Sequence, residues 1–450
     1  ERARRMLGIT RYPGQAEKFR ALRDVAWPIA RRFEASTGCR DGTDGARFSR
    51  APVAVTFTVG GDSDGTAHPA PAPGEPPAVE QSPCIECGNC VSGCNHWAKN
   101  TLTMNYLPHA RQWGARLYTG VTVTRLLRTS VAGGRAGRDD QVRWHVQIDA
   151  TIAETAPDRR LLIDGEPIRL VARRVIVAGG TVGSTELLLR SRRAPRQPDG
   201  LLLSPRLGEG LSTNGDMISA AYWQRERVNA VGFDARQSAA AAAQATSKTA
   251  AMADTSANAM ADAKPGTASP SPVGPTITGL IDLRDAPRRE DQVLIEDGAV
   301  PGALGDLWAE LLATASLPHQ LTRWRFQARR WHGSRWHDLF GSLLGRKSGS
   351  ADGLLVSDEA ARHSQLLLAM GHDAAAGVMR LREAAGDAAD FRRARIDWRE
   401  ADGRRAADQP AFERQSEWLQ GVTAAGAIAI DNPLWKPLPD NLASTLSDGK

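Results

Sequence analysis

Residues 173–192 read RRVIVAGGTVGSTELLLRSR, and this stretch decides the fold class. The apolar run at 175–178 is typical of a buried strand in a parallel sheet. Two glycines follow, and residues 187–193 continue as a predicted helix. A strand, a glycine turn and a helix N-terminus direct backbone N–H groups at one point, which favours a phosphate or pyrophosphate. An ordinary turn capped by Ser184 or Thr181 remains the alternative, because the full G-x-G-x-x-G pattern is absent.

An antiparallel meander is expected ahead of this stretch. Residues 117–127 and 142–148 alternate apolar and polar side chains, as half-buried strands do. The dipeptide at 164–165, Asp-Gly, is a hairpin signal that leads into a further strand at 168–171. The meander therefore leads directly into the predicted parallel strand.

Four of the five cysteines lie together in the sequence CIECGNCVSGC, residues 84–94. Their C-x2-C-x2-C-x3-C spacing is that of a bacterial ferredoxin cluster, except that Asn95 stands where proline usually follows. Thiols at this spacing indicate a cluster, a metal ion or disulfides, and His96 is an alternative ligand close by. The fifth cysteine, Cys39, is expected to be a lone thiol. The predicted metal ligands are Cys84, Cys87, Cys90 and Cys94.

Hydrophobic periodicity predicts the remaining elements. Residues 16–33 form an amphipathic helix, bent near Pro28, with Phe19 and Phe33 on its apolar face. Residues 236–272 are of low complexity and are expected to form a surface insertion. The other predicted helices are 101–113, 317–331 and 413–425, and the other predicted strands are 52–58, 274–282, 292–295, 365–370 and 393–398.

Composition narrows the class of protein. A chain of 450 residues that is 41% hydrophobic can bury a large core. Its length corresponds to about three domain-sized units. The net charge of +6 comes from arginines scattered among acidic residues, which disfavours a nucleic-acid partner. No apolar run is long enough for a transmembrane segment. The aromatic and basic stripe at 317–331 is expected to pack in the core, with contact to a membrane surface as the alternative. The compartment is unknown, with the cytoplasm slightly favoured.

The chain resembles the glucose-methanol-choline (GMC) family of flavoenzymes, in particular its cholesterol-oxidase-like branch with an iron–sulfur motif. The resemblance is carried in family order by residues 84–106 (CIECGNCVSGCNHWAKNTLTMNY), 173–192, 207–216 (LGEGLSTNGD), 274–282, 295–304 (IEDGAVPGAL) and 363–373 (HSQLLLAMGHD). The first two stretches are the specific ones, and the others support them.

The resemblance implies a mixed α/β fold, in which a Rossmann-like FAD-binding domain is interleaved with an antiparallel-sheet substrate domain. Residues 1–100 and 223–430 would form the substrate domain, and residues 101–222 and 431–450 the FAD domain. The implied reaction is oxidation of an alcohol or a sterol-like substrate at a CH–OH group by hydride transfer to flavin. The residues implied to bind FAD are Val123, Ala178, Gly179, Gly180, Thr181, Asn214, Gly215 and Asp216.

Two family motifs are missing from the sequence. The family begins with a G-x-G-x-x-G turn that holds the FAD pyrophosphate, and none is present. Its catalytic histidine lies in an H-P-L-G-G segment, which we expect beyond Lys450. We therefore assign no catalytic residue, and we expect a fragment that retains FAD weakly and does not turn over.

Two other classes of function remain open. The cysteines could carry an iron–sulfur cluster in an electron-transfer protein, or clip a non-catalytic binding module with zinc. Within the flavoenzyme hypothesis, an iron–sulfur cluster would pass electrons to an external acceptor and make the enzyme a dehydrogenase. Substrate identity and oligomeric state do not follow from the sequence.

Overall fold

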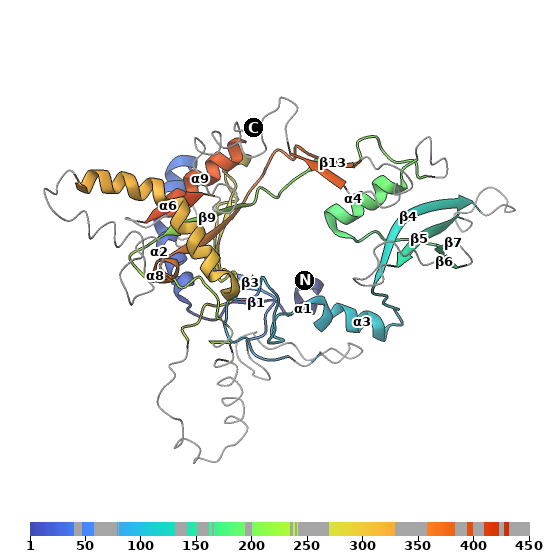
Figure 1. Cartoon of the computed structure of the whole chain (residues 1–450), viewed down its shortest axis with the longest axis horizontal. Coiled ribbons are helices and arrows are strands. Elements are labelled where there is room, and N and C mark those ends of the chain that lie inside the picture. The colour runs from blue at the N-terminus through green and yellow to red at the C-terminus, as the bar shows by residue number, and fades with distance from the viewer. Residues whose placement is uncertain are drawn as a thin grey trace, which may run out of the picture. The chain divides into compact units, whose positions relative to one another are not determined.

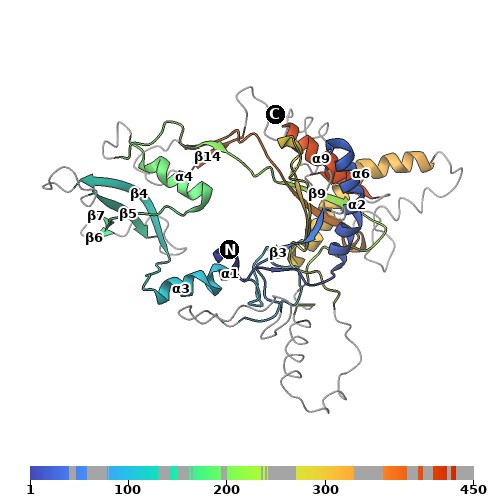
Figure 2. The same ribbon diagram turned by 180° about the vertical axis from the view of Figure 1, so that it is seen from behind.

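A computed structural model describes residues 1–39, 47–57, 79, 81–130, 142–150, 162–163, 166–193, 200–234, 237–238, 241, 270–328, 358–382, 394–398, 409–422 and 427–431. The chain divides into two compact units (Figures 1 and 2). The first unit comprises Glu1–Gly114, Asn214–His372 and Pro410–Lys450, and the second comprises Ala115–Thr213 and Asp373–Gln409. Which unit serves the flavin and which the substrate stays a prediction.

A six-stranded antiparallel sheet is the centre of the first unit. Its strands, in spatial order, are β15 (Ile428–Asp431), β9 (Met217–Tyr222), β12 (Gln365–Met370), β11 (Leu294–Gly298), β10 (Gly279–Asp282) and β2 (Phe48–Arg50). Burial alternates along β12, where Gln365, Leu367 and Ala369 are buried and their neighbours half-buried. Since successive side chains point to opposite faces, the two faces of the sheet have different surroundings.

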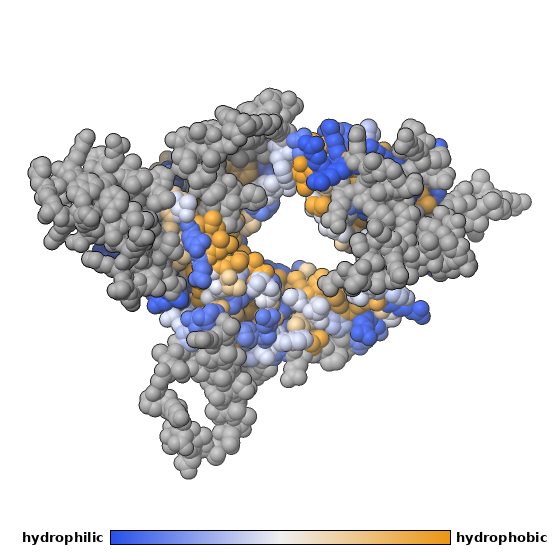
Figure 3. Space-filling model, viewed as in Figure 1, coloured by the Kyte–Doolittle hydropathy of each residue, from blue (hydrophilic) through white to orange (hydrophobic). Residues whose placement is uncertain are grey.

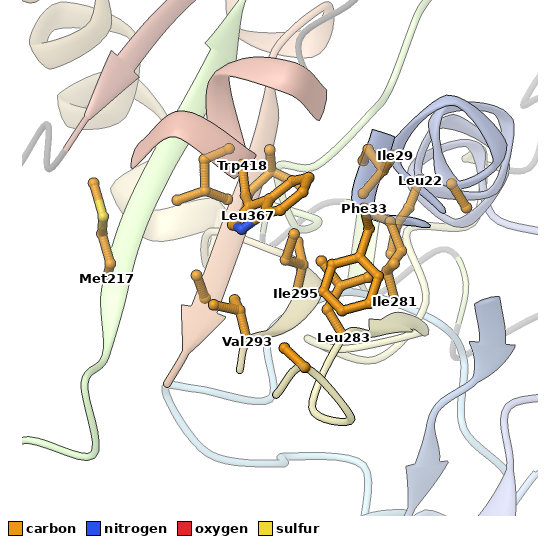
Figure 4. Close-up of a cluster of buried hydrophobic side chains, with 14 residues drawn as sticks. Leu22, Ile29, Phe33, Met217, Ile281, Leu283, Val293, Ile295, Leu367 and Trp418 are labelled. Carbon is orange, nitrogen blue, oxygen red and sulfur yellow. The ribbon is translucent and has the colours of Figure 1, made fainter. Parts of the chain in front are cut away.

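Helices α2 (Glu17–Thr37) and α9 (Pro410–Val422) cover one face of this sheet. Their apolar side chains meet those of β10, β11 and β12 in one core cluster (Figure 4). Phe33 of α2 and Trp418 of α9 pack with ring centroids 5.6 Å apart. The predicted apolar face of α2 is confirmed, and the helix continues through Pro28.

Helices α6 (Gly305–Ala328) and α8 (Asp358–Arg362) pack over part of the opposite face. Trp308 and Leu312 of α6 contact the side of the sheet formed by Ala220, Tyr222 and Ile430. Figure 3 shows hydrophobic residues reaching the surface around the place where Figure 1 labels α6 and β9. This face is therefore covered only in part by the described elements.

Short elements complete the first unit. They are α1 (Arg2–Met6), β1 (Thr10–Arg11), β3 (Pro52–Val53), η1 (Leu102–Met104), α3 (Tyr106–Gln112), η3 (Arg289–Asp291) and η4 (Gly302–Leu304). Strand β1 pairs with β3, and Val55 makes an isolated bridge to Lys99. The strand predicted at 52–58 is thus only two residues long, and the helix predicted at 101–113 is a 3-10 turn followed by seven helical residues.

The second unit contains a four-stranded antiparallel sheet of order β4-β5-β7-β6. The strands are β4 (Val121–Ser130), β5 (Val142–Ala150), β7 (Glu166–Ala172) and β6 (Leu162–Ile163), which confirms the predicted meander. Helix α4 (Gly180–Ser191) packs on the edge strand β4. Ser191 Oγ accepts a hydrogen bond from Leu126 N at 2.8 Å, and Arg190 Nε donates to Thr124 O at 3.0 Å.

A separate sheet contains β14 (Ala394–Asp397), β13 (Gly377–Leu381) and β8 (Glu209–Leu211).

The mixed α/β fold with antiparallel sheets is confirmed. The buried parallel strand predicted at 175–178 is not: these residues form no strand, and Ile176 is 90% exposed. The low-complexity segment 236–272 lies almost entirely outside the described residues, as do residues 329–331 of the aromatic stripe and the segment 432–439. Among the described residues, no helix has the length and apolarity needed to cross a membrane.

Candidate functional site

The cysteine loop, residues 84–94, is anchored in the first unit by its backbone. Cys84 N donates to Thr56 O at 2.8 Å, and Phe233 N donates to Cys87 O at 2.8 Å. Val273 and Gly274 both donate to the Glu86 carbonyl, at 2.9 and 3.0 Å. Three chain segments far apart in the sequence therefore fix the conformation of the loop.

Asn89 joins the loop to two of its neighbours. Its Nδ2 donates to Phe233 O at 2.9 Å, and its Oδ1 accepts from Gly302 N at 2.8 Å. The fit is close, because a Cβ atom on Gly232 would lie 2.3 Å from Asn89 Oδ1. One amide side chain thus satisfies two backbone groups, a role that the sequence pattern did not indicate.

The loop lines a cavity of about 530 Å3. All four cysteines border it, together with Lys99, His96, Phe233 and residues 301–303. Lys99 Nζ donates to the Cys90 carbonyl at 3.1 Å, which places a positive charge beside the loop. The four predicted ligands thus border one cavity, and their role toward a metal stays a prediction.

The thiols do not form a metal site in this arrangement. Among the described residues, no three His, Cys, Asp or Glu side chains form a group that could hold a metal ion. Burial raises the pKa of Cys84 and of Cys87, and neighbouring thiols raise both further. The structure gives the predicted iron–sulfur cluster no support.

A buried polar network lies against the loop. Lys18 Nζ is 2.5 Å from Asp297 Oδ2, and both side chains are fully buried. The other Asp297 oxygen accepts from the backbone N–H groups of Thr278 and Gly279, at 2.8 and 2.7 Å. Burial lowers the pKa of Lys18, and the Asp297 charge opposes that shift. Hydrophobic periodicity alone gave no sign of a lysine on the buried side of α2.

The side chain of Glu86 extends this network into the cysteine loop. Burial raises the pKa of the Glu86 carboxyl, while the hydrogen bond with Tyr12 and the charge of Lys18 lower it. Glu86 has a left-handed backbone with φ 56°, which turns the chain between Cys84 and Cys87. The network is accordingly part of what shapes the loop.

The glycine turn of the second unit is open to solvent. Ala178, Gly179, Gly180 and Thr181 are all exposed. Gly180 has φ +72°, and a Cβ atom built on it would meet nothing within 4 Å. Helix α4 begins there with no side-chain cap and no acidic residue in its first turn. Ser184 Oγ, inside α4, accepts at 3.0 Å from the N–H of Gly179, the residue that precedes the helix. The helix N-terminus is thus available to an anion.

The other residues implied to bind FAD lie outside the glycine turn. Val123 is half-buried on β4 of the second unit. Asn214, Gly215 and Asp216 precede β9 in the first unit, where Asn214 and Gly215 have φ 64° and 58°. Gln415 Nε2 donates to Gly215 O at 2.8 Å, and Asn214 Nδ2 donates to Asp216 Oδ1 at 3.0 Å. The role of this set toward FAD stays a prediction.

Known proteins resemble this chain over a limited part of its length. The family model described as GMC oxidoreductase matches residues 76–213. A cholesterol oxidase from Mycobacterium tuberculosis is 31% identical over 225 residues, which are 49% of this chain and 32% of that protein. A cholesterol oxidase from Acinetobacter baumannii is 30% identical over 175 residues, 39% of this chain and 28% of that protein. The chain spans about a third of the length of these curated relatives.

These findings define the class first: a mixed α/β protein with similarity to the GMC oxidoreductases, whose family implies an FAD cofactor. More narrowly, residues 76–213 match the GMC oxidoreductase family, and the chain is similar to cholesterol oxidases over about half of its length. The matched range contains both the cysteine loop and the glycine turn. The predicted family resemblance is confirmed.

Proposed function

We propose that this protein is an FAD-dependent oxidoreductase that oxidises the CH–OH group of a sterol-like alcohol. The observation that carries the proposal is the GMC oxidoreductase match, which spans the open glycine turn at the start of α4. The similar cholesterol oxidases support a sterol-like substrate. When bound, FAD supplies an acceptor for the hydride that leaves the alcohol carbon.

The residues at the glycine turn fit part of a dinucleotide. A phosphate group binds where the backbone can come close to it and offers unpaired N–H groups. At Gly180 the space beside the backbone is open, and the N-terminus of α4 has no side-chain cap. The first turn of α4 carries no acidic side chain that would repel phosphate. Gly179 and Gly180 would therefore hold the anionic part of the cofactor.

FAD binding tests this proposal directly. We expect the protein to quench flavin fluorescence on titration with FAD, and to bind riboflavin, which lacks phosphates, at least tenfold more weakly. Gly180→Val should weaken FAD binding tenfold or more because its side chain fills the approach to the helix N-terminus. The matched control is Gly210→Val in the same unit, where φ is +79° and the space beside the residue is equally open.

The result that contradicts the proposed cofactor site is equal loss of FAD affinity in the two variants. The substrate class is tested separately, by measuring the binding of a 3β-hydroxysteroid against that of a short primary alcohol, a readout that does not need turnover. A preference for the short alcohol would overturn the sterol-like assignment.

A further inference from the structure

The cysteine loop brings four free thiols to the wall of one cavity. Cys84, Cys87, Cys90 and Cys94 all border the cavity of about 530 Å3, and each of them is half-buried. Thiols that share a cavity can react with a small molecule that enters it and then with one another. The backbone around each thiol decides which pair is able to do so.

The first two cysteines lie on backbone that is held in place. Cys84 N donates to Thr56 O at 2.8 Å, and Phe233 N donates to Cys87 O at 2.8 Å. The sulfur of Cys84 is also engaged, because Glu86 N lies 3.4 Å from it in hydrogen-bond geometry. Movement of either cysteine toward another thiol would break contacts with distant segments of the first unit.

The backbone between Cys90 and Cys94 is exposed and already turned. Val91 is 66% exposed, and Ser92 and Gly93 are exposed as well. Gly93 N donates to Cys90 O at 3.4 Å, and Gly93 has φ +108°, which closes a turn over residues 90–93. The ends of such a turn lie within about 7 Å, and a disulfide joins Cα atoms about 4.4–6.8 Å apart. A small adjustment of this exposed turn therefore brings Cys90 and Cys94 into bonding range.

The charges around the cavity favour an anionic visitor. Lys99 Nζ donates to the Cys90 carbonyl at 3.1 Å, and His96 lines the cavity two residues after Cys94. The acidic residue of the described lining, Asp234, is already engaged, since Gln237 N donates to its Oδ1 at 2.8 Å. An ammonium group beside the thiols raises the local concentration of anions.

We propose that Cys90 and Cys94 form a thiol–disulfide exchange site for a small anionic disulfide. The Cys90 sulfur attacks the disulfide, a mixed disulfide forms, and one small thiol leaves with the Cys90 proton. The Cys94 sulfur then attacks the Cys90 sulfur, the protein disulfide forms, and a second small thiol leaves with the Cys94 proton. The protein loses two electrons, and the small disulfide is reduced to two thiols. This site is independent of the proposed function.

Oxidised glutathione is the probe for the test. The full chain is reduced, freed of reductant, incubated with oxidised glutathione in the presence of EDTA, alkylated after denaturation and mapped by mass spectrometry. We expect a Cys90–Cys94 cross-link, with Cys84 and Cys87 recovered as alkylated thiols. Excess reduced glutathione should restore all four thiols, because the exchange is reversible.

Variants separate the two steps. Cys94→Ser removes the second thiol, so the glutathione adduct on Cys90 should accumulate at least about tenfold over wild type. Cys90→Ser should yield neither the adduct nor the cross-link. Lys99→Gln should slow the reaction at least about threefold at low salt, and high salt should reduce that difference. The matched control is Cys39→Ser, a cysteine outside the cavity lining, which should keep the cross-link.

Several results would overturn the inference. One is recovery of all four thiols after incubation, and another is a cross-link that joins Cys84 or Cys87. Modification of Cys39 as rapid as that of Cys90 would show non-selective oxidation. Thiols that react only after EDTA has released zinc or iron would be metal ligands instead. Wild-type mapping decides these outcomes even where a variant does not fold.

Discussion

The cysteine loop and the glycine turn carry the two most specific sequence motifs, and their surroundings are opposite. The loop is joined to three distant segments by backbone hydrogen bonds and by the Asn89 side chain. The turn is exposed, and the apolar residue Ile176 ahead of it is 90% exposed. Protein contacts therefore account for the shape of the loop, whereas the exposed turn retains unpaired groups that can receive a ligand.

Ligand chemistry alone would predict that the cysteine loop, rather than the glycine turn, depends on a bound ligand. The structure indicates the reverse. Four thiols at ferredoxin spacing suggested that a metal shapes the loop, yet backbone hydrogen bonds and the Asn89 side chain fix its conformation. A helix N-terminus without a cap has N–H groups that only solvent or an anion satisfies. The glycine turn is thus the motif that stays exposed to a ligand.

The largest expected effect comes from breaking the buried ion pair below the loop. Lys18→Met leaves Asp297 charged and buried, which should lower the free energy of unfolding by about 3–5 kcal/mol in a denaturant titration. Arg23→Met, at an exposed position of the same helix, is the control. Replacing both partners, as Lys18→Met with Asp297→Leu, should recover part of the loss. A change below about 1 kcal/mol for Lys18→Met would contradict a structural role for the pair.

Asn89→Ala should have the next largest effect. It leaves Phe233 O and Gly302 N without their side-chain partner, so we expect a loss of about 2–3 kcal/mol together with faster proteolysis of the loop. Ser92→Ala removes only an exposed bond to Asn89 O and serves as control. Equal stability of these two variants would mean that Asn89 does not clamp the loop.

Alanine at two glycines of α4 should act with opposite signs. Gly180→Ala forces a side chain into a backbone with φ +72°, which should destabilise the protein by about 1 kcal/mol. Gly183→Ala lies inside the helix with open space beside it, so it should stabilise by about 0.5–1 kcal/mol. Thermal unfolding of both variants measures the difference, and stabilisation by Gly180→Ala would show that the turn does not require its left-handed glycine.

The smallest expected effect is that of a chelator. Because protein groups hold the cysteine loop, EDTA should change the Tm by less than about 1 °C, well below the shift caused by 1 kcal/mol. Replacing Cys90 and Cys94 by serine should make no difference to this result. A large fall in Tm with EDTA, accompanied by release of zinc or iron, would restore the metal-site hypothesis.

Sequence periodicity predicted elements well where one face of a helix or strand is buried within its own unit. Helical spacing predicted the apolar face of α2. Alternation of apolar and polar residues predicted the paired strands β4 and β5 and the strand β12. It failed at 175–178, where a strand pattern needs neighbouring strands that the described residues do not supply. A strand is stable only when its backbone groups are paired, and a local pattern does not specify the partner.

The candidate site was harder to predict than the fold. The cysteines and the glycine turn were found because their spacing is distinctive. Lys18 and Asn89 were missed because each acts through tertiary neighbours: a carboxylate 279 positions away for Lys18, and two backbone groups for Asn89. The sequence pattern gave no signal for either contact.

The contact between α4 and β4 has a consequence for the behaviour of the chain during synthesis. An edge strand offers unpaired groups to any other strand, and Ser191 and Arg190 occupy two of those groups at Leu126 and Thr124. The ribosome completes β4 some sixty residues before it reaches Ser191. During that interval the ten-residue edge is uncovered, so the nascent chain passes through a stage in which α4 has yet to protect it from aggregation.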